Sequence, residues 1–264
     1  MAIRKDIRDP VGNDGRSRVA DDLDLRSTGD GVGPATPEEN LLLAKLPPEE
    51  LKAFTAKAEK VTLKTRDVLF ENGDAITTVY FPVTAMISLL SVLAGGPSIE
   101  AITVGHEGAA GLPLFHGVKT SFVRAVCQIG GDAYKISADD FESLLETSPA
   151  LTAMLHKYAQ FTQDSIAQSA ACNSIHLIEQ RCARWLLLSA DAVRNAHFSL
   201  TQEFFAQMLA VRRSGVTTAM GGLERKNLVT GRYGTITIVD REGLTRIACE
   251  CYNSVKARRN ELLA

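Results

Sequence analysis

The middle of the chain, from Val61 to about Ile136, alternates short apolar runs with turn residues. Asn72-Gly73-Asp74 and Gly95-Gly96 are typical turn signals between such runs. Many short strands at this spacing predict an antiparallel β-barrel or β-roll. The predicted strands are Asp67–Phe70, Thr77–Phe81, Met86–Leu90, Ile99–Val104, Phe122–Val126 and Ala133–Ile136.

Helical patterns flank this strand-rich region on both sides. Before it, Thr36-Pro37 predicts the capped start of a short helix that ends at Pro47-Pro48, and a second short helix follows over Glu49–Ala58. After it, Asp139-Asp140 opens a further short helix. Residues 1 to about 36 are rich in Asp, Arg and Gly and have no usable apolar period, which predicts a disordered tail.

A long helix is predicted from Ser148-Pro149 onward, because a capping residue precedes proline at the first helical position. One set of its residues follows alternating steps of four and three, which is typical of a coiled-coil seam. We therefore expect two copies of this helix to pair in a homodimer. The alternative is that the helix packs on its own β-roll. The predicted seam is Leu151, Leu155, Tyr158, Thr162, Ser165, Ser169 and Cys172.

The segment from Leu200 to Val229 has the pattern of two short helices joined by a tight turn. Thr201 can cap the first helix, Ala210-Val211 makes the turn, and Arg212 to Lys226 forms the second helix. The second helix would turn its apolar residues inward and expose its N-terminal half, the part of a recognition helix that reads base edges in the major groove. Arg can bind guanine through two hydrogen bonds, and Ser and Thr can reach bases or phosphates.

A β-hairpin follows, with a tight turn at Gly231–Gly234 and a strand over Thr235–Val239. Two helices followed by such a hairpin predict a winged helix-turn-helix whose wing lies against the DNA backbone. The residues that we expect to contact DNA are Thr201, Arg212, Arg213, Ser214, Thr217, Thr218, Arg232 and Tyr233.

The charge distribution agrees with a DNA-binding C-terminal part. The 264-residue chain has a formal net charge of −2. From Arg181 onward, however, it holds 13 Lys and Arg against 7 Asp and Glu, which favours a polyanionic partner for that third. The sequence has no apolar run of about eighteen residues and no secretory signal, so we expect a cytoplasmic protein without a membrane segment.

The sequence contains no recognisable catalytic or metal-binding motif. Cys249-Glu-Cys251 lacks a second pair or a nearby histidine at zinc-site spacing, and residues two apart on a helix point to different faces. We interpret both cysteines as packing residues of a C-terminal helix. An odd total of five cysteines argues against a disulfide framework. We therefore expect no enzymatic activity, no bound metal and no cofactor.

The order of β-roll, long helix and winged helix resembles the Crp/Fnr family of transcription regulators over about residues 40–250. The most specific stretch is Thr201–Asp240, which includes Leu223–Val229 before the wing. In the roll, Gly111–Phe115 and Phe122–Ala125 are similar to the phosphate-binding cassette of the family. The resemblance implies a homodimer that binds double-stranded DNA, contacts RNA polymerase and responds to a small-molecule effector.

Individual positions depart from the best-known members of that family. Arg213 falls on the first base-reading arginine, but Ser214 and Thr218 fall where a glutamate and a second arginine are common, so we expect a different operator. Ala110-Gly111 and Lys119-Thr120 stand where the cyclic-AMP binders have Gly-Glu and Arg-Ser, so we expect another effector or none. The residues expected to line an effector pocket are Gly111, Lys119 and Thr120.

These patterns together predict an α+β fold and a dimeric, sequence-specific DNA-binding regulator of transcription. The alternative is a nucleotide- or ligand-sensing module that acts through protein contacts and keeps a vestigial winged helix; the salt dependence of DNA binding separates the two. The expected units are a tail over 1–36, an effector-type β-roll over 37–148, a dimerisation helix over 149–173 and a winged helix-turn-helix domain over 174–264.

Overall fold

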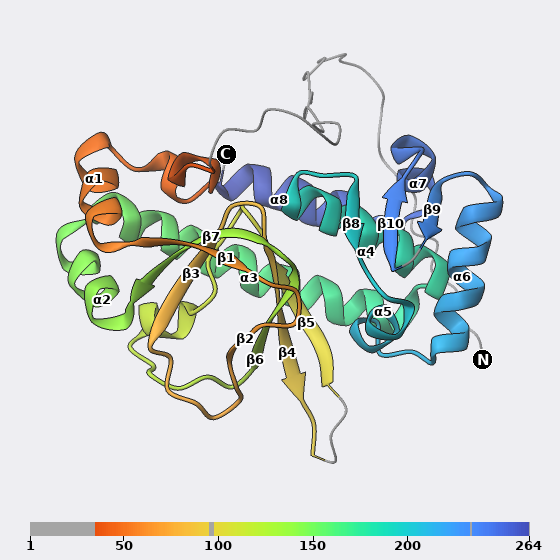
Figure 1. Ribbon diagram of the computed structural model, residues 1–264, viewed down its shortest axis with the longest axis horizontal. Coiled ribbons are helices and arrows are strands. Elements are labelled where there is room, and N and C mark those ends of the chain that lie inside the picture. The colour runs from red at the N-terminus through yellow and green to blue at the C-terminus, as the bar shows by residue number, and fades with distance from the viewer. Residues whose placement is uncertain (1–34, 95–97, 233, 264) are drawn as a thin grey trace, which may run out of the picture.

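The structure, a computed structural model, describes residues 35–94, 98–232 and 234–263. The predicted tail up to residue 34, the Gly95-Gly96 turn and Tyr233 lie outside these residues. Two antiparallel sheets form a β-roll in the first half of the chain, with strand orders β1-β7-β3 and β2-β6-β4-β5 (Figure 1). The strands are β1 (Glu59–Leu63), β2 (Val68–Phe70), β3 (Thr78–Pro82), β4 (Met86–Val92), β5 (Ser98–Val104), β6 (Arg124–Ile129) and β7 (Gly131–Ser137).

Helices and 3₁₀ turns surround the roll. The short helices predicted over 49–58 and from Asp139-Asp140 are confirmed, and so is the long helix that begins at Pro149. The side chain of Ser137 caps the second of these helices by accepting a hydrogen bond from the N–H of Asp140. The elements are η1 (Pro37–Glu39), η2 (Leu43–Lys45), α1 (Pro48–Lys57), η3 (Leu112–His116), α2 (Ala138–Thr147) and α3 (Pro149–Ile175).

The helix predicted from Thr36 onward is wrong, because η1 and η2 are separate 3₁₀ turns with buried Asn40 between them. The Nδ2 group of Asn40 donates to the carbonyl oxygens of Pro82 and Gly108 at 2.8 and 2.9 Å, and its Oδ1 accepts from the N–H of Leu42. A side chain that binds neighbouring backbone groups competes with helical hydrogen bonds. Asn40 thus ties the N-terminal turns to the roll instead of extending a helix.

Strands β3 and β7 of the three-stranded sheet have buried side chains on both faces of the sheet, whereas β1 is mostly exposed. On one face, the ring of Phe81 contacts Phe54 of α1 and Phe141 of α2, with ring centroids 5.0 and 6.4 Å apart. On the other face, Ala133 packs in a core that it shares with Ile87 of the four-stranded sheet. Burial on both faces explains the apolar runs that the sequence shows in this region.

The long helix α3 lies against the roll at a glycine. A Cβ atom at Gly108 would lie 2.3 Å from the ring of Tyr158, so only glycine permits this approach of helix to roll. α3 has 27 residues, but neither α3 nor any other helix among the described residues combines the length and apolar character needed to cross a membrane.

The seam predicted on α3 faces the interior of its own chain. Five of its seven residues are buried, and the first three belong to the core formed with α1, α2 and β3. The alternative, a helix packed on its own roll, is therefore correct for this stripe. Periodicity alone gives the spacing of an apolar stripe but does not say what covers it. The five buried residues are Leu151, Leu155, Tyr158, Ser165 and Cys172.

The second half of the chain forms a winged helix-turn-helix followed by a last helix that packs along α3 (Figure 1). An ion pair between Asp164 of α3 and Arg258 of the last helix, with oxygen and nitrogen 2.6 Å apart, holds these two helices together. The elements are α4 (Ile178–Val193), β8 (His197–Ser199), α5 (Gln202–Met208), α6 (Arg213–Arg225), β9 (Val229–Arg232), β10 (Thr235–Ile238), α7 (Arg241–Ile247) and α8 (Cys251–Leu263).

Glu50 of α1 supplies a carboxylate to the N-terminus of α3, where it accepts hydrogen bonds from the N–H groups of Ala150 (3.1 Å) and Leu151 (3.3 Å). Negative charge is stabilised at a helix N-terminus by the helix dipole and by N–H groups that have no partner within the helix. We predict that Glu50→Gln lowers the free energy of unfolding by about 1 kcal/mol.

Urea titration of the variant and the parent measures this loss. Added salt should reduce the difference between their free energies of unfolding. Glu49→Gln is the matched control, since Glu49 is the preceding residue of the same helix and is exposed. Equal effects of the two substitutions would show that the carboxylate of Glu50 does not stabilise α3.

Candidate functional site

Helices α5 and α6 form the predicted helix-turn-helix. The side chain of Thr201 caps α5 by accepting a hydrogen bond from the N–H of Phe204 at 3.3 Å. Ala210 makes the turn with a left-handed backbone, at φ 52°. The inward residues of both helices are buried in one core, as the sequence predicts: Phe205, Met208, Leu209, Val216, Met220 and Leu223.

The N-terminal half of α6 is exposed. Arg212 stands at its N-cap and Arg213 is its first residue, and neither guanidinium has an ion-pair partner among the described residues. The helix runs unbroken to Arg225 in spite of its three glycines. Gly221 and Arg225 lie about two and three turns beyond Ser214 on its outward face, although the sequence analysis did not list them as DNA contacts.

The two threonines of this half are engaged locally. Thr217 Oγ1 lies 3.0 Å from the carbonyl oxygen of Arg213 and 2.9 Å from Gln202 Oε1, so it links α6 to the start of α5. Thr218 Oγ1 donates to the carbonyl oxygen of Ser214 at 3.0 Å. Such back-bonding leaves the threonine methyl groups and the remaining lone pairs as the features these residues can present to a ligand.

The wing is a three-stranded sheet in the order β8-β10-β9, in which β8 is a strand that the sequence analysis missed. Its signal, the three residues His197–Ser199, is too short to distinguish from a loop. Arg232 is exposed at the end of β9. Glu224 of α6 holds the wing, because its carboxylate accepts a hydrogen bond from the N–H of Gly231 at 3.1 Å.

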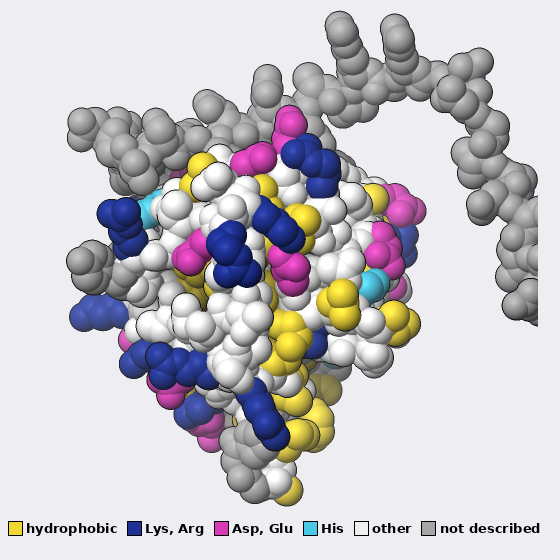
Figure 2. Space-filling model, turned by 90° about the vertical axis from the view of Figure 1, so that its right-hand side faces the viewer, with side chains coloured by type: hydrophobic (Ala, Val, Ile, Leu, Met, Phe, Trp, Pro, Cys, Tyr) yellow, Lys and Arg dark blue, Asp and Glu magenta, His cyan; other side chains and the backbone are white. Residues whose placement is uncertain are grey.

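Figure 2 turns the end of the molecule that carries α6 toward the viewer. Lys and Arg side chains are spread over this face, and Asp and Glu side chains lie between some of them. Lys226, at the C-terminal end of α6, forms an ion pair with Glu179 at 2.7 Å, so part of the positive charge of this helix is balanced within the chain. The charge of Arg212 and Arg213 at the start of α6 has no such partner among the described residues.

The winged helix and the roll share one continuous core, which fixes the position of α6. Met86 and Leu90 of β4 pack in this core with Trp185 of α4 and Phe205 of α5. Polar contacts follow the same junction. Glu100 of β5 accepts hydrogen bonds from Trp185 Nε1 at 2.7 Å and from the hydroxyl of Ser88 at 2.6 Å.

The three residues expected to line an effector pocket do not line the cavity between the roll and the C-terminal half. Gly111 caps η3 with a left-handed backbone, and Thr120 pairs with Ala75. The ammonium of Lys119 lies 3.3 Å from the carboxylate of Glu142. The cavity lies between β5, α3, α4 and α8, and polar residues of its lining include Glu100, Ser165, Asn173, Arg184 and Arg259.

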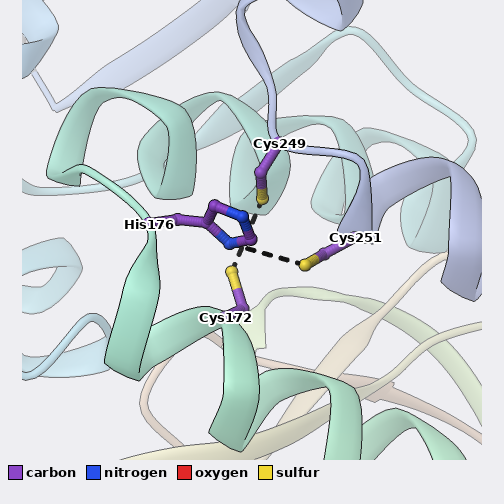
Figure 3. A group of neighbouring side chains, drawn as sticks. All are labelled: Cys172, His176, Cys249 and Cys251. Atoms are coloured by element: carbon purple, nitrogen blue, oxygen red, sulfur yellow. Dashed lines mark hydrogen bonds between the residues drawn. The ribbon is translucent and has the colours of Figure 1, made fainter. Parts of the chain in front are cut away.

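Four metal-ligating side chains meet where α3 ends and α8 begins (Figure 3). One ligand atom from each of Cys172, His176, Cys249 and Cys251 lies within 4.8 Å of all the others. The three thiols are buried and form a cluster of their own. Hydrogen bonds from Cys249 and His176 lower the pKa of the Cys172 thiol, so negative charge is favoured at this sulfur.

The sequence-based interpretation of the last two cysteines is corrected by this geometry. Cys249 does not lie on a helix, because α8 begins at Cys251, so the rule that residues two apart face different ways does not apply. A histidine is close, but it comes from the end of α3, about 75 residues earlier. The spacing Cys172-x₃-His176 was the available signal, since residues four apart on a helix share a face.

Comparison with known proteins agrees with this fold. Residues 180–247 match the Crp-like helix-turn-helix domain. Among curated proteins no match was found.

Three solved structures illustrate the likeness over the whole fold. FixK2 from Bradyrhizobium japonicum is 14% identical, with 73% of this chain and 98% of that one covered and a TM-score of 0.61. A transcriptional regulator of the CRP family from Thermus thermophilus is 17% identical, with 71% and 96% covered and a TM-score of 0.59. The c-di-GMP-responsive global regulator CLP from Xanthomonas campestris is 18% identical, with 73% and 99% covered and a TM-score of 0.56.

Identities this low establish a shared fold. The chain has the α+β fold of Crp/Fnr transcription regulators, a β-roll followed by a long helix and a winged helix-turn-helix. Its residues 180–247 match a Crp-like helix-turn-helix domain, in the part of the chain where the sequence most specifically resembles these regulators.

The partly buried carboxylate of Glu100 makes the stability of this arrangement depend on pH. Burial raises the pKa of Glu100, and the hydrogen bonds from Ser88 and Trp185 offset only part of that rise. The folded chain therefore holds the proton of Glu100 more tightly than the unfolded chain does. The free energy of unfolding should fall as pH rises from the ordinary pKa of a glutamate through the raised value.

We predict that Glu100→Gln, which carries no charge to desolvate and still accepts the Trp185 hydrogen bond, is more stable than the parent at pH 7. This advantage should shrink toward zero near pH 4, where the carboxyl group is protonated in both states. Urea titrations at the two pH values measure the difference. Glu146→Gln, at an exposed position of α2, should show no such dependence, and an unchanged pH profile of Glu100→Gln would reject the assignment.

Proposed function

We propose that the protein is a homodimeric regulator of transcription that reads double-stranded DNA with the N-terminal half of α6. The observation that carries this proposal is the exposed Arg212–Arg213 pair at the leading end of a helix that projects from the body of the molecule (Figure 1). A recognition helix places this end in the major groove, where arginine can hydrogen-bond guanine through two atoms. The predicted contacts from Ser214, Thr218 and the wing belong to this proposal.

The positions of the supporting residues agree with such a role. Thr201 precedes α6 in the sequence, at the start of α5, and Arg232 follows it, at the end of β9. Both side chains are exposed, as expected for residues that bind the DNA backbone. Thr217 positions α6 through Gln202. Cytoplasmic location and contact with RNA polymerase complete the proposed regulator.

We predict that Arg213→Ala weakens binding to the operator by about 1–3 kcal/mol, or roughly 5- to 150-fold, and relaxes the preference at one base pair. The operator would first be selected from a random pool of duplexes, and mobility-shift titrations would compare the variants. Lys52→Ala removes one exposed positive charge from α1, at the opposite end of the molecule from α6, and should leave the affinity nearly unchanged.

The parent chain should also lose affinity steeply as salt concentration rises, because bound phosphates release counterions. Affinity for random duplex DNA that hardly depends on salt, together with equal binding by Arg213→Ala, would favour a module that acts only through protein contacts.

The outward face of α3 is the surface that we propose for dimerisation. Each residue of this stripe follows a residue of the predicted seam by one position. The stripe therefore has the same spacing along the helix, in alternating steps of four and three residues. Ile166 on this stripe is 40% exposed, which is unusual for a large apolar side chain. His156 on the same stripe contacts Phe115 of the roll at a ring-centroid distance of 4.8 Å. The stripe consists of Thr152, His156, Ala159, Gln163, Ile166 and Ala170.

We predict that Ile166→Glu shifts the protein from dimer to monomer, because a two-fold axis along α3 brings the two new charges close together. The dimer dissociation constant should rise at least roughly tenfold, as measured by sedimentation. Ala153→Glu adds the same charge at an exposed position on another side of α3 and is the control. A dimer that tolerates Ile166→Glu would exclude this face.

The cavity between β5, α3 and α4 is the place where we propose that an effector would bind, because that cavity adjoins the junction with the winged helix. Its lining carries both basic residues, among them Arg184 and Arg259, and acidic residues, among them Glu100 and Asp191, which favour a polar ligand with hydrogen-bond donors and acceptors. A ligand there would touch both the roll and α4, and could shift the balance between two orientations of α6. The predicted pocket at Gly111, Lys119 and Thr120 is the other candidate, and it would require Lys119 to leave Glu142.

A further inference from the structure

We propose that Cys172, His176, Cys249 and Cys251 form a binding site for a single zinc ion. The ion would join the last turn of the long helix α3 to the start of the last helix α8. This proposal stands on the positions of four side chains and does not depend on what the winged helix binds.

The four ligand atoms have the spacing that one tetrahedral ion requires. Zinc–sulfur bonds of about 2.3 Å place the sulfur atoms of a tetrahedral site about 3.8 Å apart. Cys172 Sγ lies 3.5 Å from Cys249 Sγ, and Cys251 Sγ lies 3.6 Å from His176 Nδ1. All four atoms lie within 4.8 Å of one another, and Figure 3 shows the four side chains pointing toward a common centre.

Local structure brings these residues together from distant parts of the sequence. Cys172 lies in the last turn of α3, and His176, the residue that caps its C-terminus, donates its N–H to the carbonyl oxygen of Cys172 at 3.1 Å, which keeps the two side chains close. Cys249 lies in the short turn between α7 and α8, where the N–H of Tyr252 donates to its carbonyl oxygen at 3.1 Å. Cys251 is the first residue of α8. Three cysteines and one histidine make up a ligand set found in structural zinc sites.

The surroundings orient the ligands as those of a metal site do. Glu250 Oε1 lies 3.1 Å from His176 Nε2, a contact in which Nε2 donates to the carboxylate, so that Nδ1, which faces the sulfur cluster, would be the nitrogen that binds the ion. Gln168 Nε2 donates a hydrogen bond to Cys251 Sγ at 3.0 Å. Such carboxylate–histidine and amide–sulfur contacts hold metal ligands in place.

The other two cysteines of the chain provide a contrast. Cys127 and Cys182 are buried in the apolar cores of the roll and of the winged helix, and burial raises the pKa of each thiol to about 12. Cys172, Cys249 and Cys251 form a cluster separate from these cores. They are thus grouped with one another and with an imidazole, rather than used as small apolar residues.

Two other uses of the cluster fit the geometry less well. A disulfide needs sulfur atoms about 2.05 Å apart, and it would use two of the thiols while leaving the third thiol and the imidazole without a role. An iron–sulfur cluster places several iron and sulfide atoms between its ligands and needs a wider cage than one in which all four ligand atoms lie within 4.8 Å. Among single ions, zinc is favoured by a tetrahedral set of three thiolates and one imidazole.

The position of the site gives the ion a structural consequence. Its ligands flank residues 177–248, which contain α4, the helix-turn-helix, the wing and α7. Both ends of this unit would be fastened at a single point beside α3. Zinc would thereby add stability to the whole chain, because folding and metal binding are coupled when the unfolded chain lacks a formed site.

The test is metal content of the full chain, expressed with zinc in the medium and purified under reducing conditions without chelator. Elemental analysis should find one zinc ion per chain, and Co²⁺ exchanged into the site should show the visible bands of a tetrahedral thiolate complex. Cys251→Ala and His176→Ala should lose most of the zinc, whereas Cys182→Ala, which removes a sulfur from another buried position, should keep it.

Glu250→Gln covers the case in which a ligand variant fails to fold, because Glu250 is exposed and contacts only the rim of the site. It should bind zinc roughly 10- to 100-fold more weakly than the parent while remaining folded. The proposal is overturned if the parent chain neither retains nor takes up zinc, if Cys251→Ala and Cys182→Ala bind it equally, or if the purified protein contains iron with sulfide. A Cys172–Cys249 disulfide that persists in reducing buffer would also overturn it.

Discussion

Burial of the four-stranded sheet of the roll against α4 and α5 is the contact on which the rest of the arrangement depends. Strands β4 and β6 supply apolar side chains to the core of the winged helix, so the two halves of the chain cannot pack independently. This contact sets the direction in which α6 projects. It also places a partly buried carboxylate, that of Glu100, and a cavity at the same junction. A ligand or a proton bound at this junction would act on the packing that positions α6.

The long helix α3 presents different surfaces on its different sides. Its buried stripe packs on the roll and on α8, and its outward stripe, which contains Ile166, is free for a second copy of the chain. Its last turn supplies Cys172 and His176 to the cluster beside α8. One continuous helix of 27 residues connects these three places. In the proposed dimer it would link the roll, the second copy of the chain and the winged helix.

Local sequence patterns predicted most of the helices and strands. The predictions failed where contacts with distant parts of the chain decided the structure. The strands of the roll, the capped start of α5 and the inward side of α6 follow from periodicity and capping residues, which act over a few positions. The interpretation of residues 36–46 as a helix failed because buried Asn40 binds two carbonyl groups far away in the sequence. The seam on α3 had the correct spacing, but the apolar stripe is covered by the roll instead of a second chain.

The sequence by itself determined the class of fold, the exposed arginines at the start of α6 and the departure of the roll from the cyclic-AMP binders. These features depend on residue type and short-range spacing, which the chain carries locally. Only the tertiary structure decided which side of α3 is free and that Cys172, His176, Cys249 and Cys251 meet. The reason is physical: side chains separated by about 75 residues come within bonding distance only after α8 has packed along α3, and no local pattern records that packing.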